Sequence, residues 1–206
     1  MKILAYDSSS EVLSLALFED ETLIGEMESA LFTRHTSTLA PGIDMLLKSH
    51  RMGLADVDVI AVGLGPGSFT GLRVGVATAK DLAYAAKKKL VGVSSFQALV
   101  SGLAAWRGKK ALALDAKKGK YYAAVFEMKK GVPRLVEGPA LVTEEGLARL
   151  RKRGIEVLEN GALGHPKASG VVKACLELIR KKKFMDPFRI EPLYLHPRDC
   201  NVTRKT

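Results

Sequence analysis

The first thirty residues contain short apolar runs separated by polar turns, which is typical of β-strands. Apolar side chains dominate residues 2–7, 12–19 and 22–28, and the polar turns Asp7-Ser-Ser-Ser10 and Asp20-Glu21 separate these segments. Short apolar runs joined by such turns are typical of antiparallel sheets. The pattern therefore predicts that the chain begins with a three-stranded meander whose first turn contains an aspartate and three serines.

The next stretch changes to a helical period and then alternates strands with helices. Leucine and isoleucine recur at helical spacing through residues 39–47, and the apolar run 57–62 predicts a buried strand. Three further elements are expected, in order a helix to about residue 88, a strand over 90–93 and a helix over 96–106. Alternation of this kind indicates an α/β protein.

The strand–turn–strand pattern then returns at an offset of 108 residues. Six of the sixteen positions 4–19 are identical at that offset, and Asp7 falls on Asp115. The elements expected after this point are strands over 110–115, 121–128, 134–142 and 155–158, helices over 143–153 and 170–183, and an edge strand over 191–195. Internal repetition exposes architecture. The sequence therefore predicts two related lobes, residues 1–105 and residues 106–206.

A glycine-rich stretch from Gly63 to Gly75 joins the buried strand 57–62 to the following helix. Glycine is used where φ must be positive or where another group approaches the backbone closely. The loop could present backbone N–H groups to an anion at a helix N-terminus, or it could be a tight connection that needs room. Glycine content leaves both interpretations open. No carboxylate follows about twenty residues later, and Leu72-Arg73 replaces the Lys-Ser/Thr of a Walker motif, so neither nucleotide fingerprint is complete.

Composition is that of a globular protein, but the charge is uneven. The 206 residues are 47% hydrophobic and 26% charged, and the net charge of +10 divides into −2 for residues 1–100 and +12 for residues 101–206. A basic half can attract nucleic acid, yet its lysines and arginines lack interleaved aromatic residues, which favours a solvated surface.

Compartment and topology follow from what the sequence does not contain. No apolar run approaches the roughly 18 residues of a membrane span. The early Asp7 does not fit a signal peptide, and Cys175 and Cys200 show no disulfide or metal spacing. A cytoplasmic protein without membrane contact is therefore expected.

Catalytic candidates are few. Two lobes that each open with strand–Asp–turn–strand suggest the actin/hexokinase/Hsp70 class of ATPases. In that class, Asp7, Ser8 and Asp115 would mark a nucleotide site or the vestige of one. Serines rather than glycines follow Asp7, and an aspartate that only closes a turn is the alternative. The histidines are scattered without a pair at helical spacing, so no metal site is predicted.

Small residues recur every four positions on the helix after the glycine loop, at Gly71, Gly75, Ala79 and Ala83. They form a smooth ridge on one helix face. Such a ridge lets another backbone approach closely, either that of a partner protein or that of the chain's own sheet. Both interpretations stay open at this point.

Several stretches carry a specific resemblance. The most specific is the signature loop, which consists of Gly65, Pro66, Gly67, Ser68, Phe69, Thr70 and Gly71 and continues as Leu-Arg-Val-Gly75. The others are Ile3-Leu-Ala-Tyr-Asp7, Arg34-His35-Thr36, Val91-Gly-Val-Ser-Ser95, Asp115-Ala-Lys-Lys-Gly-Lys-Tyr121 and Glu191-Pro-Leu-Tyr-Leu195. Together they closely resemble the bacterial TsaB (YeaZ) family from end to end. The tail from Leu195 to Val202 departs from the family's usual Leu-Arg-Asn-Asn-Val pattern.

This resemblance implies a two-lobed ASKHA (actin/hexokinase/Hsp70-like) fold with duplicated βββαβα-type lobes. It also implies a non-catalytic role, as a partner of TsaD and the ATPase TsaE, in forming N6-threonylcarbamoyladenosine at position 37 of tRNAs that read ANN codons. Nucleotide and metal are then expected on TsaD and TsaE and not on this chain, tRNA is expected only through the complex, and homodimers are expected for the chain alone. The metal-binding histidine pair of TsaD corresponds here to Ser95 and Leu99.

The same resemblance implies that two helices, 37–49 and 71–86, dock TsaD. The expected contact residues are Leu39, Ile43, Leu46, Gly71, Arg73, Gly75, Ala79 and Ala83. Alternatives from other classes are an autonomous ASKHA-type ATPase, a glycoprotease-like metallopeptidase and a tRNA-binding module.

Overall fold

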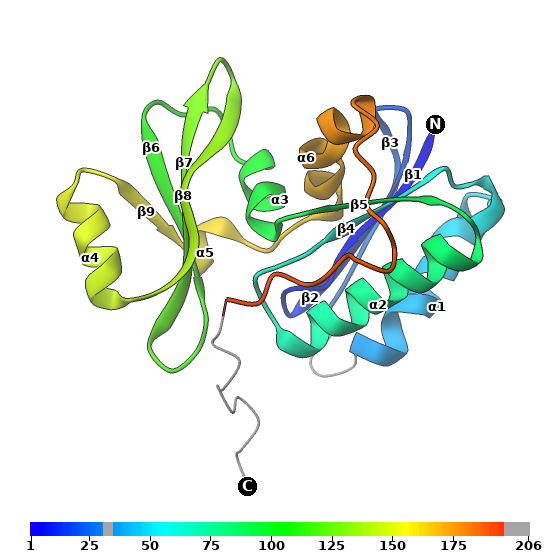
Figure 1. Ribbon diagram of the computed structural model, residues 1–206, viewed down its shortest axis with the longest axis horizontal. Coiled ribbons are helices and arrows are strands. Elements are labelled where there is room, and N and C mark those ends of the chain that lie inside the picture. Colours follow the sequence, from blue (N-terminus) through cyan, green and yellow to red (C-terminus); the bar gives the residue numbers. More distant parts are fainter. Residues whose placement is uncertain (31–34, 196–206) are drawn as a thin grey trace, which may run out of the picture.

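Two β-sheets lie side by side in the computed structural model, each covered by helices (Figure 1). The structure describes residues 1–30 and 35–195. Arg34 of one family-like motif and the divergent tail from residue 196 onward lie outside the described residues. The first sheet has the strand order β3-β2-β1-β4-β5, and the second has the order β8-β7-β6-β9.

The first lobe follows the expected order of elements closely. It consists of β1 (Lys2–Asp7), β2 (Val12–Glu19), β3 (Thr22–Ala30), α1 (His35–Ser49), the 3-10 turn η1 (Leu54–Asp56), β4 (Val59–Gly63), α2 (Phe69–Ala85), β5 (Lys89–Val93) and α3 (Ser95–Ser101). The first three strands form the predicted antiparallel meander, and β4 and β5 extend it in parallel. The apolar run of β4 is buried on both faces, as parallel strands usually are.

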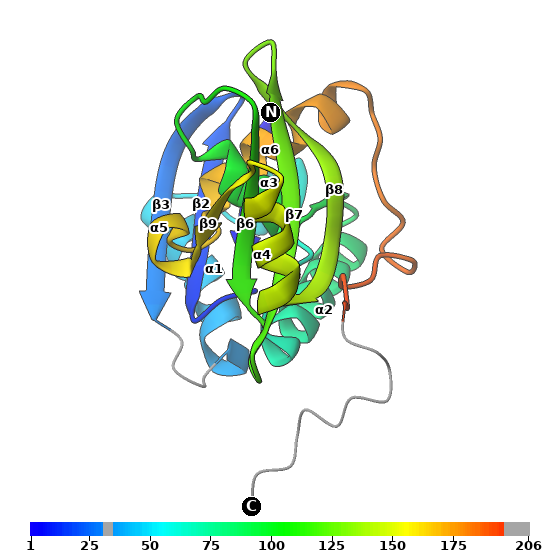
Figure 2. The same ribbon diagram turned by 90° about the vertical axis from the view of Figure 1, so that its left-hand side faces the viewer.

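The second lobe repeats this beginning. It consists of β6 (Lys109–Asp115), β7 (Lys120–Lys129), β8 (Val132–Thr143), α4 (Glu144–Lys152), β9 (Glu156–Glu159) and α5 (Asn160–Leu163), and α6 (Ala168–Arg180) follows. Three antiparallel strands, a helix and a parallel strand beside the first therefore occur twice. This duplication confirms the predicted two-lobed ASKHA-like fold (Figure 2).

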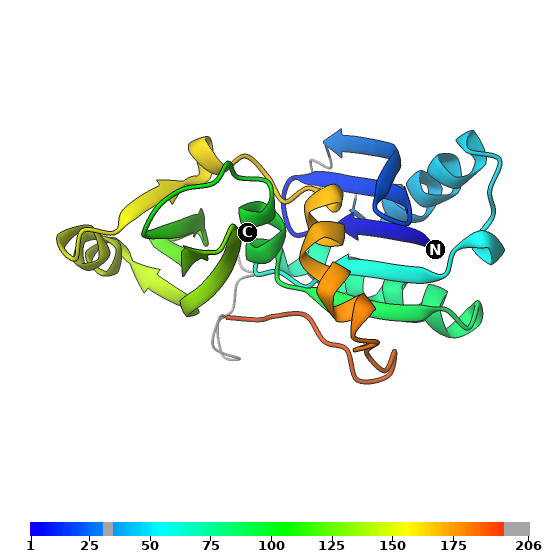
Figure 3. The same cartoon turned by 90° about the horizontal axis from the view of Figure 1, so that it is seen from above.

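Helix α6 returns to the first sheet although it follows the second lobe in sequence (Figure 3). Its apolar side joins one core cluster with Ile3 and Ala5 of β1, and the Ala168 N–H donates to Ser14 Oγ of β2 at 2.8 Å. The second sheet has no free face for it, because α3 covers one side and α4 the other. The boundary predicted at residues 105/106 falls between α3 and β6, but the last helix packs with the first lobe.

Helices α1 and α2 cover the opposite face of the first sheet, and the small-residue ridge of α2 faces inward. Ala79 is fully buried, and the Tyr6 hydroxyl of β1 donates to the Gly75 carbonyl at 2.9 Å. The structure buries seven of the eight expected partner contacts in this way, namely Leu39, Ile43, Leu46, Gly71, Gly75, Ala79 and Ala83. These residues face the interior of this chain, because the small residues let α2 approach the chain's own sheet. Arg73 alone is exposed.

The chain after α6 forms a strap along the outer edge of the first sheet. The sequence predicts a helix to residue 183, but α6 ends at Arg180. It also predicts an edge strand over 191–195, but the strap forms no strand there. Met185 N–H donates to the Leu90 carbonyl of β5 at 2.8 Å, and Leu193 N–H donates to the Leu64 carbonyl at 2.8 Å. The prolines within the strap lack the donors that a continuous ladder needs.

Substitution of Ala79 tests this packing of α2. Ala79→Arg is expected to lower the free energy of unfolding by more than about 3 kcal/mol, because the guanidinium would be buried without a partner. Ala77→Arg is the matched control two residues away, and its exposed position predicts a change within about 0.5 kcal/mol. Urea denaturation of both variants measures the difference. Equal stabilities would contradict the inward orientation of the ridge.

Candidate functional site

Asp7 ends β1 and is fully buried at the point where the first turn meets the glycine loop. Its Oδ1 accepts hydrogen bonds from the Ser9 backbone N–H at 2.8 Å and the Ser9 hydroxyl at 2.6 Å. Its Oδ2 accepts from the Ser95 hydroxyl at the start of α3, also at 2.6 Å. The chain's own donors therefore occupy both oxygens of this carboxyl group.

Burial raises the pKa of Asp7 above its ordinary value, because a charged carboxylate is poorly solvated there. The hydrogen bonds from Ser9 and Ser95 oppose this shift because they stabilise the charged form. The group thus carries a desolvation cost that its three donors offset in part.

The glycine loop owes its glycines to the same first turn. A Cβ at Gly63 would lie 1.8 Å from Asp7 Oδ2, one at Gly67 would lie 2.1 Å from the Ser9 carbonyl oxygen, and one at Gly75 would lie 2.2 Å from Ser8 Oγ. The Ser68 N–H also donates to the Ser9 carbonyl at 2.7 Å. Of the two interpretations that the sequence left open, the structure favours the tight connection, because the space above the loop holds the chain's own turn.

The remaining signature residues shape the entry into α2. Gly65 has a φ of +93°, which favours glycine, and its peptide bond to Pro66 is cis. Ser68 is the N-cap of α2 and accepts from the Gly71 N–H at 3.3 Å. Phe69 and Thr70 are exposed at the start of the helix. Ser8 is buried, and its hydroxyl donates to the Gly71 carbonyl at 2.9 Å.

Asp115 does not occupy the position equivalent to Asp7. Side chains alternate along β1, so Asp7 shares the sheet face of Ile3 and Ala5, which α6 covers. Along β6, Asp115 shares the face of Ala111 and Ala113, which α4 covers. Helix α4 corresponds to α1, since each follows the third strand of its lobe. The two aspartates therefore point to opposite faces of the duplicated sheet, and the expectation of a matched pair of acids is wrong.

A one-residue difference in strand register explains this outcome. Ala5 pairs with Ala16 in the first hairpin, whereas at the offset of 108 residues Ala113 pairs with Ala123 and not with Ala124. A slip by one residue moves every side chain of a strand to the other face. The sequence repeat is therefore in phase for β2 and β7 but out of phase for β1 and β6.

Charged side chains gather around Arg151 at the carboxyl end of the second sheet. The Arg151 guanidinium of α4 forms ion pairs with Glu144 at 2.7 Å and with Glu159 at the end of β9. The neighbouring Glu144 carboxylate raises the pKa of Tyr121, mainly through a hydrogen bond with its hydroxyl. Asp115 lies beside this group, and its Oδ1 accepts from the Lys117 N–H at 2.8 Å. This cluster is exposed, and its carboxylates pair with Arg151 and Lys117 of the chain itself.

The remaining candidates have structural roles. Leu99 is buried in the core between the lobes, and Ser95 is held by Asp7 and by the Gly65 N–H at 3.0 Å. Burial raises the pKa of the Cys175 thiol to about 12. Among residues 1–30 and 35–195, no group of three potential metal-ligating side chains converges, and no helix is long and apolar enough to cross a membrane.

Sequence reasoning missed the outward face of α1 and α2. Met45 on α1 is 59% exposed and Phe69 on α2 is 49% exposed, which is unusual for such large apolar side chains. Phe69 packs against Tyr194 of the strap with ring centroids 5.2 Å apart. The Arg73 guanidinium lies over the Phe69 ring, 5.4 Å from its centroid. The helical period indicates which residues share a face but not which face is outward.

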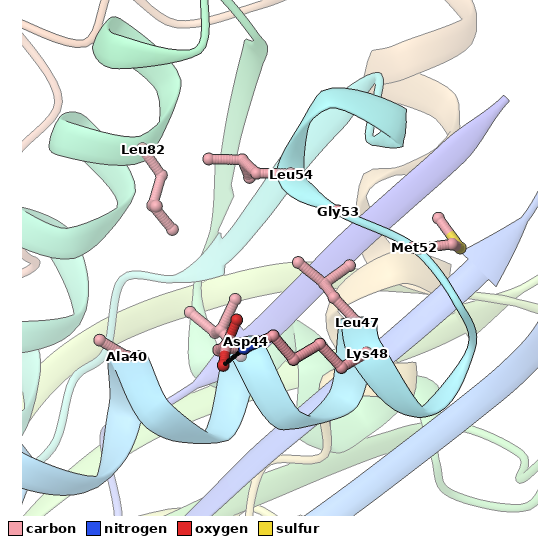
Figure 4. Close-up of a pocket in the computed structure, with 9 residues that line it drawn as sticks. Ala40, Asp44, Leu47, Lys48, Met52, Gly53, Leu54 and Leu82 are labelled. Carbon is pink, nitrogen blue, oxygen red and sulfur yellow. Dashed lines mark ion pairs between the residues drawn. The ribbon is translucent and has the colours of Figure 1, made fainter.

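An apolar groove of about 230 Å³ lies between α1, η1 and α2 (Figure 4). Leu47, Met52, Leu54 and Leu82 line it, and the ion pair of Asp44 with Lys48, at 2.7 Å, borders it on α1. The groove and the exposed apolar side chains belong to the same pair of helices. We call the outward surface of these helices, from Met45 to Phe69, the α1–α2 face.

Comparison with known proteins agrees with this fold. The profile of the family described as "TsaD: tRNA N6-adenosine threonylcarbamoyltransferase" matches residues 30–177. YeaZ from Pseudomonas aeruginosa superimposes with a TM-score of 0.79 at 23% identity, over 94% of this chain and 99% of that one, which shows the shared fold.

Two relatives carry the same printed name, tRNA threonylcarbamoyladenosine biosynthesis protein TsaB. The Escherichia coli protein is 36% identical over 131 residues, which are 62% of this chain and 55% of the relative. The Bacillus subtilis protein is 32% identical over 166 residues, which are 80% of this chain and 71% of the relative. The match thus spans just over half of the first relative and more than two thirds of the second.

The duplicated sheets define a protein of the two-lobed, actin- and hexokinase-like class. The family match places it in the group that includes the TsaD threonylcarbamoyltransferases. Within that class, the chain belongs to the TsaB (YeaZ) family.

The pH dependence of stability tests the burial of Asp7. Because the folded pKa is raised, the folded state binds more protons than the unfolded state between the ordinary and the raised value. The contribution of this group to stability is therefore present at low pH and is lost as the pH rises through the folded pKa. Lowering the pH from neutral is expected to stabilise the wild type relative to Asp7→Asn, which cannot titrate.

Chemical denaturation of both proteins across the acidic range measures this difference, and titrating groups that do not interact with Asp7 cancel in the comparison, whereas His165, whose charge lowers the pKa of Asp7, does not. Asp115→Asn, at the exposed end of β6, is the control for loss of one negative charge. A stability gap between wild type and Asp7→Asn that moves the opposite way on acidification would contradict the assignment.

Proposed function

We propose that this chain is a non-catalytic subunit that binds and supports TsaD in forming N6-threonylcarbamoyladenosine at position 37 of tRNAs that read ANN codons. TsaE and tRNA join this assembly through the complex, and the nucleotide and metal belong to TsaD and TsaE. Membership of the TsaB family supports the pathway, since the relatives are named for threonylcarbamoyladenosine biosynthesis.

The geometry at Asp7 supports a non-catalytic role. In two-lobed ATPases of this class, an acid at the end of the first strand would face metal or water. Here both carboxyl oxygens accept hydrogen bonds from Ser9 and Ser95, and the glycine loop lies directly against the first turn. An acid that is fully buried and held in this way stabilises the turn and does not face solvent.

The observation that carries the proposal is the α1–α2 face. Met45 and Phe69 project from it, and the apolar groove between the helices can receive a side chain of a partner. Large apolar side chains on a rigid helical surface are typical of the centres of protein interfaces. The exposed side chains and the groove belong to two helices that pack on each other, which suits a helical partner surface such as that of TsaD, and in its absence a second copy of the chain.

Substitution of Met45 tests the docking face. Met45→Glu is expected to weaken binding to the TsaD protein of the same organism by about tenfold or more, because the carboxylate would be desolvated in an apolar interface. Its thermal stability should match that of the wild type, since the side chain is 59% exposed. Isothermal titration calorimetry measures the affinity, and light scattering after size exclusion measures the mass of the complex.

Val132→Glu is the matched control, because Val132 is 52% exposed on β8 of the other lobe. It should leave TsaD binding unchanged. Equal affinity of Met45→Glu and wild type would exclude the α1–α2 face. Failure of the wild type to form any complex with TsaD, with ATP hydrolysis by the chain alone, would instead favour an autonomous ATPase.

A further inference from the structure

The fold brings two lysine runs together at the outer edge of the first sheet. Lys87 to Lys89 join α2 to β5, and Lys181 to Lys183 follow α6, almost a hundred residues later. The strap connects them: Phe184 lies 5.2 Å from the Lys89 Nζ, and the Met185 N–H donates to the Leu90 carbonyl at 2.8 Å. Figure 1 shows this segment passing from α6 across β5 toward α2.

Exposed aromatic side chains lie on the same edge. Phe188 of the strap is 73% exposed and Tyr84 of α2 is 65% exposed, and their rings meet edge to face with centroids 5.1 Å apart. Two such rings on a surface leave apolar faces open to solvent, which is costly unless a ligand covers them. The aromatics that the sequence lacks beside its lysines are thus supplied by the fold.

The lysines of this edge are free to take an anion. In the described part of the chain, Lys87, Lys182 and Lys183 are exposed and form no direct ion pair, although the charge of Lys183 acts on Glu177. Two acids close by are engaged, since Asp186 pairs with Arg189 at 3.6 Å and Glu177 pairs with Lys181. We call the surface formed by Tyr84, Lys87, Lys89, Lys182, Lys183 and Phe188 the edge patch.

Two of these lysines stand where glycine is the usual residue. Lys87 and Lys182 follow the last turns of α2 and α6 with φ values of 52° and 53°. In each case the next residue closes the helix with a six-residue turn, Lys88 N–H to Ala83 and Lys183 N–H to Leu178, both at 2.8 Å. A non-glycine residue in this left-handed conformation is unfavourable. A positive charge at a helix C-terminus would offset part of that cost.

We propose that the edge patch binds unpaired RNA, with the lysines contacting backbone phosphates and the Tyr84 and Phe188 rings stacking on a base. Proteins bind single-stranded nucleic acids with cations that follow the phosphate backbone and with aromatic rings on which the bases stack. The surface stands apart from the α1–α2 face around Met45, so the proposal does not depend on which partner docks there.

The left-handed lysines allow a test that spares the fold. Lys87→Gly combined with Lys182→Gly removes two charges and relieves two unfavourable backbone conformations, so stability should be maintained or increased. The probe is a fluorescein-labelled single-stranded RNA of about 15 nucleotides. Binding is measured by anisotropy over a range of salt concentrations, with the chain alone and in its complex with TsaD.

The double variant is expected to bind about tenfold more weakly at physiological salt and to reduce the salt slope by about 1.4, which corresponds to two lost phosphate contacts. Phe188→Leu should weaken binding about fivefold or more without changing the slope, because stacking involves no counterion release. A duplex RNA should bind more weakly than the single strand, since its bases are not available for stacking.

Lys118→Gly combined with Lys130→Gly is the matched control on the second lobe. Both lysines are exposed and left-handed, with φ values of 54° and 51°, and their loss removes the same charge. An equal loss of RNA binding in this control would overturn the edge patch in favour of a general charge effect. Unchanged binding in Lys87→Gly/Lys182→Gly, or tighter binding to vesicles of anionic phospholipid than to RNA, would also overturn it. TsaD binding should be unaffected in both double variants, which separates this result from a failure of the docking face.

Discussion

The buried carboxyl group of Asp7 is the interaction around which the first lobe is arranged. Ser9 and Ser95 donate to it from two distant parts of the chain, and the turn that they stabilise lies directly on the glycine loop. Because a desolvated acid without donors would be costly, the turn, the loop and the start of α3 must assemble together. The glycines at 63, 67 and 75 are required since any side chain there would enter the space that this turn occupies.

The same contact fixes how α2 starts against the first sheet. A first turn that packs on its own glycine loop gives rigidity to the base of α2, while the outward side of α1 and α2 retains apolar side chains and a groove. The edge patch uses a different part of that helix, where the strap crosses the end of the sheet. Helix α2 thus packs its small residues on the core, exposes its outer face, and ends beside a lysine-rich surface.

Much of the fold could be predicted from the sequence because each signal was local. The apolar run of residues 12–19 and the uninterrupted apolar run before the glycine loop correspond to β2 and β4 within two residues. The position of Asp7 in a turn also followed from its serine neighbours. The roles of Ser95, Phe188 and Tyr84 could not be predicted, because Ser95 contacts Asp7 across 88 residues and Tyr84 contacts Phe188 across 104, and no pattern within either segment indicates the other.

The sequence by itself determined the two-lobed duplicated architecture, the order of its strands and helices, and the family, since all of these depend on periodicity and on contiguous motifs. Only the tertiary structure decided which way each stripe faces. A helical period places Gly75 and Ala79 on one side of α2 but does not indicate whether sheet or solvent lies there, and a one-residue change of register turns Asp115 away from the position that its identity with Asp7 suggests. Orientation depends on long-range packing, and the chain specifies that only when both lobes, α6 and the strap are in place.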